Sequence, residues 1–340
     1  MCVIVAKRIN LYNSDKKRWF LYKIRDRVYR PTLDTKISSK DGVESVFLID
    51  TVNDWTEGVN SHGIMIVSSA LQNHADEKDG EENPDPTKPM RVSRNGFILR
   101  QCLRKKNIKD IIHILRSELF TGNTFISDGD RLFVMECYIK QDAIDRETDS
   151  IVDIESIKFA SEIHQIVMKG IKSNDYVVKV VEITDSDLVV RTNHGEILPE
   201  AGFQKTDEDP DGWKSSKSRY QIVYDSMDDM DEKTHPFEIL TILKNLGDKK
   251  VHKDPEMRPI RIFPDTKYFS GCIVMLTSIG SLYVLPIECD FKSGGTDPNK
   301  ENGVSVVILP KRLPLFESGR RCLVDHINIQ QLENQLGYSI

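Results

Sequence analysis

Apolar segments of strand length, paired across short polar turns, recur along most of this chain. CVIVA (2–6) and WFLYKI (19–24) flank the turn NSDKK, and FISDGDRLFVMECY (125–138) has an Asp-Gly turn between two apolar runs. CIVMLT (272–277) and SLYVLPIE (281–288) are separated by a further short turn. An Asp-Gly between apolar runs is a strong β-hairpin signal. The pattern predicts antiparallel sheets.

Helical periodicity is confined to a few stretches. Apolar residues recur at helical spacing in 91–104 and 108–118, and helices are also expected around 216–230 and 236–247. Residues 140–190 alternate apolar and polar positions and predict further strands. Two helices inserted between runs of antiparallel strands are typical of the α+β class.

The connections and ends complete this outline. SVFLID (45–50) and GIMIVSSAL (63–71) predict strands joined by the turn-rich NDWTEGVNSHG, and the acidic residues 73–90 predict a long surface loop. No internal repeat or strong linker divides the chain, so we expect one large domain over 2–290. Residues 291–340 form a C-terminal extension, expected to pack on that domain and to end in a short helix or a tail.

Charge and hydropathy exclude some classes of protein. The 340 residues include 47 Lys and Arg and 53 Asp and Glu, for a net charge of −6. A mildly acidic chain is a poor general nucleic-acid binder. No segment approaches the roughly 18 apolar residues that a membrane helix needs, and the first 20 residues lack a signal-peptide core. We therefore expect a cytoplasmic protein that binds neither nucleic acid nor membranes.

The six cysteines show no metal or redox motif. No two have CxxC spacing, and the eight His residues form no HxxxH or HxH pair. We expect free thiols, no metal and no cofactor. Five of the cysteines lie in mixed or apolar stretches, where a small buried residue is the simplest interpretation.

Cys2 differs from the other five because of its position. Methionine aminopeptidase removes Met1 when the second residue is small, so the mature chain would begin with Cys2. One residue would then carry a thiol nucleophile and an α-amine with a pKa near 7.7–8.0, which can accept the thiol proton. Taken alone, the position favours a cysteine that has no function, because any protein can have Cys at position 2.

Three further segments carry residues suited to such a site. In LYKIRDRVYRP (21–31), Asp26 can orient the α-amine, while Lys23 and Arg25 can stabilise a thiolate; an exposed charged strand end is the alternative. In VVRTNHGEILP, the amide of Asn193 suits an oxyanion donor. A Cys–His pair with His194 ranks lower, because the α-amine already fills the role of base.

The third segment is WKSSKSRYQIV (213–223), which we interpret as a Ser-rich turn followed by Arg219 at a helix start. Arg219 can bind a carboxylate of the substrate or of Asp26. A helix cap followed by a solvated arginine is the alternative.

In this order, MCVIVAK, LYKIRDRVYRP, WTEGVNSHGIMIVSSAL, RTNH and SKSRY resemble the N-terminal nucleophile (Ntn) hydrolases with a Cys nucleophile. The resemblance is to the choloylglycine hydrolase and acyl-coenzyme A:6-aminopenicillanic acid acyltransferase-like branches. IRDRVYRP is also similar to the NRDE proteins. Two positions depart from the family pattern: Lys23 replaces an Arg, and Ser68, Ser69 and Ala70 replace an Asn, so that Ser68 or Ser69 would donate to the oxyanion or substrate instead.

The resemblance implies a four-layer αββα sandwich with two antiparallel sheets, often assembled as a homo-oligomer. It also implies that the Cys2 thiolate attacks a small-molecule amide, with Asn193 stabilising the oxyanion, Asp26 orienting the α-amine, and Arg219, Arg25 and Lys23 tuning the site. The function expected is hydrolysis of non-peptide C–N bonds. The alternatives are an acyltransferase or amidotransferase with the same nucleophile, and a catalytically inactive binding or structural protein of the same fold.

Overall fold

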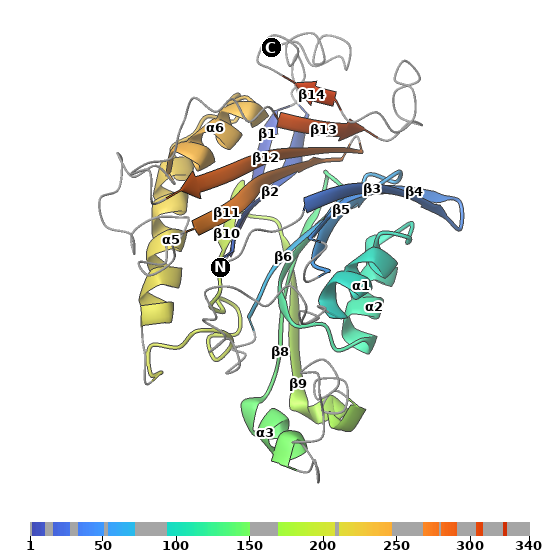
Figure 1. Ribbon diagram of the computed structural model, residues 1–340, viewed down its shortest axis with the longest axis vertical. Coiled ribbons are helices and arrows are strands. Elements are labelled where there is room, and N and C mark those ends of the chain that lie inside the picture. Colours follow the sequence, from blue (N-terminus) through green and yellow to red (C-terminus); the bar gives the residue numbers. More distant parts are fainter. Residues whose placement is uncertain are drawn as a thin grey trace.

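Two seven-stranded antiparallel sheets face each other at the centre of the molecule (Figure 1). The computed structural model describes residues 2–10, 16–27, 33–50, 54–71, 94–149, 169–207, 211–246, 268–278, 280–290, 304–308 and 322–324.

The first sheet contains the N-terminal strand near one edge. Its order is β10-β1-β2-β11-β12-β13-β14, and β1 pairs with β10 on one side and β2 on the other. The last two strands come from the residues after 290. The strands are β1 (Cys2–Asn10), β2 (Lys17–Arg27), β10 (Leu188–Arg191), β11 (Tyr268–Thr277), β12 (Ser281–Asp290), β13 (Val304–Ile308) and β14 (Cys322–Val324).

The second sheet is a meander whose strands follow the chain order β3-β4-β5-β6-β7-β8-β9. Its strands are β3 (Leu33–Lys40), β4 (Val43–Asp50), β5 (Thr56–Asn60), β6 (Met65–Ser69), β7 (Gly122–Ser127), β8 (Leu132–Ile139) and β9 (Tyr176–Ile183).

Helices cover the outer face of each sheet (Figure 1). The helices α5 (Asp211–Asp228) and α6 (Pro236–Leu246) pack on the first sheet, and α1 (Arg94–Cys102) and α2 (Ile108–Ser117) pack on the second. A further helix, α3 (Gln141–Asp149), follows β8. The predicted four-layer αββα arrangement is confirmed.

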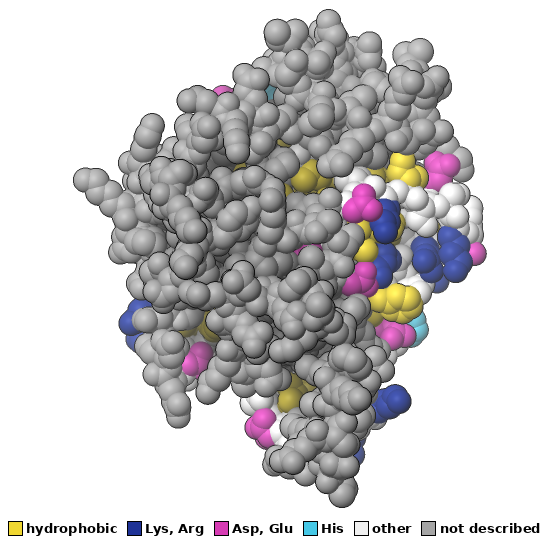
Figure 2. All heavy atoms as spheres, viewed as in Figure 1, with side chains coloured by type: hydrophobic (Ala, Val, Ile, Leu, Met, Phe, Trp, Pro, Cys, Tyr) yellow, Lys and Arg dark blue, Asp and Glu magenta, His cyan; other side chains and the backbone are white. Residues whose placement is uncertain are grey.

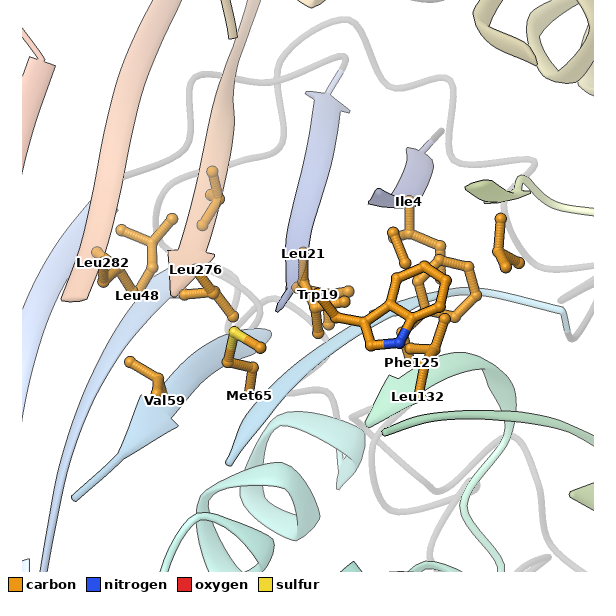
Figure 3. Packing of buried hydrophobic residues seen from close by; sticks show 14 of the residues in the cluster. Ile4, Trp19, Leu21, Leu48, Val59, Met65, Phe125, Leu132, Leu276 and Leu282 are labelled. Atoms are coloured by element: carbon orange, nitrogen blue, oxygen red, sulfur yellow. The ribbon is translucent and has the colours of Figure 1, made fainter. Parts of the chain in front are cut away.

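Alternation along β1 divides its side chains between two layers. Val3 and Val5 join the apolar cluster beneath α5 and α6, whereas Ile4 and Ala6 join the cluster between the sheets. Figure 3 shows the inter-sheet cluster, in which Ile4 lies with Trp19, Leu21 and Phe125. Because side chains alternate with a period of two, Cys2 belongs to the inter-sheet face of β1.

The helix α1 packs tightly against the connection between β4 and β5. A Cβ atom on Gly96 would lie 1.6 Å from the carbonyl oxygen of Asp54, so only glycine permits this approach. Arg100 Nη2 forms an ion pair with the carboxylate of Asp54 at 2.5 Å. The second inserted helix begins after Asn107, whose side chain accepts from the Asp110 N–H at 2.9 Å.

Most predicted elements are confirmed, including the inserted helix pair and the Asp-Gly hairpin, while some predictions were wrong. The turn-rich connection NDWTEGVNSHG (53–63) contains strand β5, and α3 occupies part of the stretch 140–190 that was assigned to strands. Helix α5 begins at Asp211, so the serines expected in a turn lie inside it. Residues 322–324 form a strand, and the acidic loop 73–90 lies outside the described residues.

The described surface carries both charges. Figure 2 shows basic and acidic side chains interspersed on the described part of one face. Among the described residues, no helix is long and apolar enough to cross a membrane.

Candidate active site

Cys2 lies at the first described position of β1 and is 5% exposed. Its backbone nitrogen donates to Asn193 Oδ1 at 3.1 Å, and its carbonyl oxygen accepts from Arg219 Nη1 at 3.0 Å. Both backbone groups of Cys2 are therefore held by two of the residues that the sequence singled out.

Asn193 follows β10 and connects three parts of the site. Its Oδ1 accepts from Cys2 and from Arg219 Nη2 at 3.2 Å, and its Nδ2 donates to the carbonyl oxygen of Ala70 at 3.0 Å. Its backbone N–H donates to Ser216 Oγ at 2.9 Å. An amide nitrogen carries two N–H groups, so Nδ2 has a donor in addition to the one directed at Ala70.

Arg219 reaches the site from the interior of α5, not from a helix start as expected. Its Nε donates to the carbonyl oxygen of Ser215 at 3.2 Å, which orients the guanidinium toward Cys2 and Asn193. The side chain is fully buried. A cation here stabilises the amide oxygen of Asn193 and the Cys2 carbonyl rather than binding a surface anion.

A buried group of charges adjoins Cys2 between the sheets. Arg25 is the direct β2 partner of Cys2, and Lys23 is two residues earlier on the same face. Lys23 Nζ pairs with Glu57 Oε2 at 3.0 Å, Arg25 Nη1 pairs with Glu57 Oε1 at 3.4 Å, and Arg25 Nη2 lies 3.7 Å from Asp50 Oδ2. All four side chains are fully buried, and we call them the buried ion cluster.

Burial and charge act in opposite directions on the pKa of Lys23. Burial lowers this pKa, and the negative charges of Glu57 and of a Cys2 thiolate oppose the shift. The ammonium also lies 4.9 Å from the centre of the Trp55 ring, a favourable cation–π distance. Lys23 is therefore an ammonium whose charge depends on its neighbours, close enough to Cys2 to interact with its thiolate.

Asp26 lies in β2 opposite Gly271, but its side chain is outside what the structure describes. Its expected contact with the α-amine remains a prediction. Asn193 Oδ1 occupies one hydrogen-bonding position at that nitrogen.

The two candidate serines on β6, Ser68 and Ser69, have side chains on opposite faces of the strand. Ser69 Oγ donates to the carbonyl oxygen of Thr192 at 2.7 Å and so fixes the segment next to Asn193. Ser68 is two residues after Ile66, which packs beneath α1 and α2. The hydroxyl of Ser68 therefore lies on the helix-covered face of β6, opposite to the inter-sheet face that carries Ser69. The structure does not bring Ser68 to Cys2.

The imidazole of His194 is directed away from Cys2. Its Nδ1 lies 2.7 Å from Ser216 Oγ and 2.9 Å from Thr192 Oγ1, and its Nε2 lies 2.6 Å from Glu196 Oε1. The ring is nearly fully buried. His194 therefore contacts polar groups behind Asn193 rather than the thiol.

Glu136 organises the turn that follows Asn193, although the sequence did not single it out. Its carboxylate accepts the backbone N–H groups of Glu196, Ile197 and Leu198 at 3.2, 2.7 and 2.8 Å. Arg191 Nε pairs with the same carboxylate at 2.8 Å. Within FVMECY the signal was a charged residue at an inward-facing position of an apolar strand.

Glu57, Asp50 and Ser216 were also missed. Glu57 alternates with Val59 in TEGVN, which places it on the inter-sheet face, and Asp50 ends the apolar run SVFLID. Such carboxylates in apolar strands point to buried partners, because an unpaired buried charge is costly. The hydroxyl of Ser216 had no comparable signal within the Ser-rich KSSKS.

Three other cysteines are buried free thiols. Burial raises the pKa of Cys137 and Cys272 to about 12 and raises that of Cys102 further. Cys272 is the β11 partner of Arg25, two strands from Cys2, so the two thiol residues lie about 10 Å apart. The side chains of the remaining two cysteines lie outside the described residues.

Among the described residues, no group of three or more His, Cys, Asp or Glu side chains has the arrangement to hold a metal ion.

Comparisons with known proteins find structural similarity but no match in sequence. No family model matches this chain, and no curated protein sequence matches it. Among solved structures, the chain is similar to penicillin V acylase from Agrobacterium tumefaciens, with 10% sequence identity, a TM-score of 0.37, and coverage of 93% of this chain and 95% of that chain.

Proposed function

We propose that this chain is an Ntn hydrolase that cleaves non-peptide C–N bonds in linear amides, with Cys2 as nucleophile after removal of Met1. The observation that carries the proposal is the hydrogen bond from the Cys2 nitrogen to Asn193 Oδ1. It ties the future α-amine to an amide that also carries a free oxyanion donor. The thiol and its base would thus lie beside the donor that the reaction requires.

The reaction follows from these groups. The α-amine accepts the proton of the Cys2 thiol, and the thiolate attacks the amide carbon of the substrate. Asn193 Nδ2 donates its second N–H to the oxyanion. When the C–N bond breaks, the α-ammonium returns the proton to the leaving amine, and a thioester remains on Cys2. Water, deprotonated by the same α-amine, then attacks the thioester and releases the carboxylic acid and the free thiol.

The surrounding charges assist these steps. Lys23 and Arg25 stabilise the thiolate electrostatically, and Arg219 holds Asn193 Oδ1 so that the amide cannot rotate. Asp26 is proposed to orient the α-amine. Ser69 supports the segment before Asn193, whereas His194 acts behind it.

Two alternatives give different experimental results. An acyltransferase or amidotransferase would form the same thioester and transfer it to an amine in place of water. A catalytically inactive protein of this fold is favoured by the pairing of Lys23 with Glu57, which weakens the cation available to the thiolate.

Mass spectrometry of the intact chain tests the nucleophile directly. We expect Met1 to be absent and brief iodoacetamide treatment at pH 7 to label Cys2 far faster than Cys272, whose thiol is buried with a pKa of about 12. Cys272→Ser is the matched control and should leave the labelling rate unchanged. Retention of Met1, or equal labelling of the two thiols, would rule out the proposed nucleophile.

The fate of the thioester separates hydrolase from transferase. A panel of N-acyl amines should yield free carboxylic acids in wild-type protein and none in Cys2→Ser. If product forms only after a second amine is added, the transferase alternative replaces the hydrolase. If Cys2 is labelled rapidly but no thioester forms with any acyl donor, the inactive alternative is correct.

A further inference from the structure

Behind Asn193, a chain of hydrogen bonds runs from the site to an ion pair at the surface. Ser216 Oγ accepts from the Asn193 N–H at 2.9 Å and lies 2.7 Å from His194 Nδ1. His194 Nε2 lies 2.6 Å from Glu196 Oε1, and Lys217 Nζ reaches the same oxygen at 2.5 Å. Ser216 and His194 are buried, whereas the side chains of Glu196 and Lys217 are 27% and 39% exposed.

The carboxylate of Glu196 determines which imidazole nitrogen of His194 carries the proton. The pKa of Glu196 is lowered to about 2, first by its bond to His194, so this carboxylate is ionised and only accepts. His194 Nε2 must therefore carry a proton, and Nδ1 of the neutral ring accepts. The Thr192 hydroxyl lies 2.8 Å from Ser216 Oγ and donates to the carbonyl oxygen of Ser216 at 3.0 Å. We assign the Ser216 hydroxyl proton to Nδ1, its nearest acceptor at 2.7 Å.

These residue types also match a Ser–His–carboxylate triad, but the surroundings of Ser216 exclude a nucleophile. Its hydroxyl is fully buried inside α5. One of the two lone pairs of its oxygen accepts from the Asn193 N–H, and the described residues leave no open space beside the buried hydroxyl. The series of hydrogen bonds therefore ends at the backbone N–H of Asn193 and not at a position that a substrate could occupy.

Helix α5 holds Asn193 at two points one turn apart. Ser216 binds its backbone nitrogen, and Arg219 binds its side-chain oxygen. Residues three apart lie on the same face of a helix, which explains why one helix supplies both contacts. Ser216 thus controls where the backbone of Asn193 lies, and Arg219 controls how its amide is turned.

We propose that Glu196, His194 and Ser216 form a positioning relay that fixes Asn193 as the oxyanion donor. This inference rests on the proposed function. Glu196 selects the Nε2–H tautomer, the tautomer makes Nδ1 an acceptor, and Nδ1 orients the Ser216 hydroxyl so that its lone pair meets the Asn193 N–H. None of the three touches the substrate, so all are positioning residues.

Charged groups around the imidazole set the pH range in which the relay is intact. Glu196 faces it from the same turn, and Lys217 and Arg219 face it from α5, with the Tyr220 ring 6.0 Å away. Burial lowers the pKa of His194, and the hydrogen bond to Glu196 acts in the opposite direction. The neutral ring therefore persists at neutral pH, and protonation at lower pH turns Nδ1 into a donor that reverses the Ser216 bond.

Two reactions of the same thiol distinguish the relay from a general structural role. Acylation by 4-nitrophenyl acetate forms an oxyanion, whereas alkylation by iodoacetamide does not. Glu196→Gln and Ser216→Ala should each slow acylation about tenfold or more, because small misplacements of a catalytic group have large effects. Alkylation of Cys2 should change less than twofold. The acid limb of the acylation pH profile should also move in Glu196→Gln.

Matched controls lie in the same elements. Glu200→Gln makes the same change in the same turn, where the exposed carboxylate accepts a 3.4 Å bond from Tyr138 Oη. Ser226→Ala removes a hydroxyl of α5 that donates to the carbonyl oxygen of Ile222 within the helix. Both control variants should be acylated at Cys2 at the wild-type rate. Nitrogen NMR shifts of His194 in the full chain should show the Nε2–H tautomer, even if a variant fails to fold.

The outcomes separate the relay from the function on which it rests. Rapid acylation and alkylation in wild type, with acylation unchanged in Glu196→Gln and Ser216→Ala, would overturn the relay alone. An Nδ1–H tautomer of His194 would overturn it independently of any variant. If wild-type Cys2 is neither acylated nor alkylated rapidly, both the proposed function and the relay fail.

Discussion

The layer between the two sheets has two ends of opposite character. At one end, Trp19, Leu21 and Phe125 pack in an entirely apolar cluster (Figure 3). At the other, along the same strand β2, Lys23 and Arg25 lie in the buried ion cluster beside Cys2. Apolar packing stabilises a sandwich without charge, whereas buried ion pairs are weak evidence for stability. The apolar end therefore maintains the fold, and on the proposed function the charged end serves the chemistry of Cys2.

The largest expected effect concerns catalysis at the charged end. Asn193→Ala should slow acylation of Cys2 by 4-nitrophenyl acetate by about 10²–10³-fold, because it removes an oxyanion donor. Alkylation by iodoacetamide should remain rapid. Equal acylation rates in the variant and wild type would show that Asn193 supports the fold without taking part in the reaction.

The next prediction compares the two ends directly by urea unfolding. Leu21→Ala leaves a cavity and should lower the free energy of unfolding by about 3 kcal/mol. Glu57→Gln should lower it by about 3 kcal/mol as well, because it leaves Lys23 and Arg25 buried with one carboxylate fewer.

Reactivity of Cys2 should then separate these two equally destabilised variants. In Glu57→Gln, iodoacetamide labelling at pH 7 should change severalfold, because the cations beside the thiol lose a partner. In Leu21→Ala, the native-state labelling rate should stay at the wild-type value. If both variants change it equally, the division of the layer into a structural and a chemical end is wrong.

The smallest expected effect is a pH dependence of stability near Asn193. The pKa of His194 is lowered on folding by burial, so its contribution to stability is complete above the unfolded value near 6.5 and is lost as pH falls through the folded value. Glu196, with a pKa lowered to about 2, loses its contribution between about 4.5 and 2.

Stability of the wild type should therefore decline from pH 7 toward pH 5 by no more than about 1.4 kcal/mol per unit from His194. Chemical unfolding of His194→Gln across this range should give a flatter curve than the wild type. A steeper curve in the variant would contradict the lowered pKa of the imidazole.

Several parts of the site could be predicted from local pattern. Cys2, Asn193 and Arg219 were singled out as separate segments, and the structure joins them through direct hydrogen bonds. The hairpin around Asp128–Gly129 was also predictable, since its turn chemistry is local. Residues whose partners are distant in sequence were harder to predict. The role of Glu57 becomes clear only when β5 is placed opposite β2.

The sequence by itself determined the alternation of apolar and polar residues, the helix pair between β6 and β7, and the cysteine that follows Met1, because these depend on neighbouring residues and on strand and helix periods. Only the tertiary structure decided that Ser68 faces away from Cys2, that His194 serves Ser216 instead of the thiol, and that Glu136 holds the turn after Asn193. These relations depend on which face of one strand or helix meets another. His194 and Ser216 are 22 residues apart in the sequence, and Glu136 and Leu198 are 62 residues apart. Propensity along the chain carries no information on contacts at that distance.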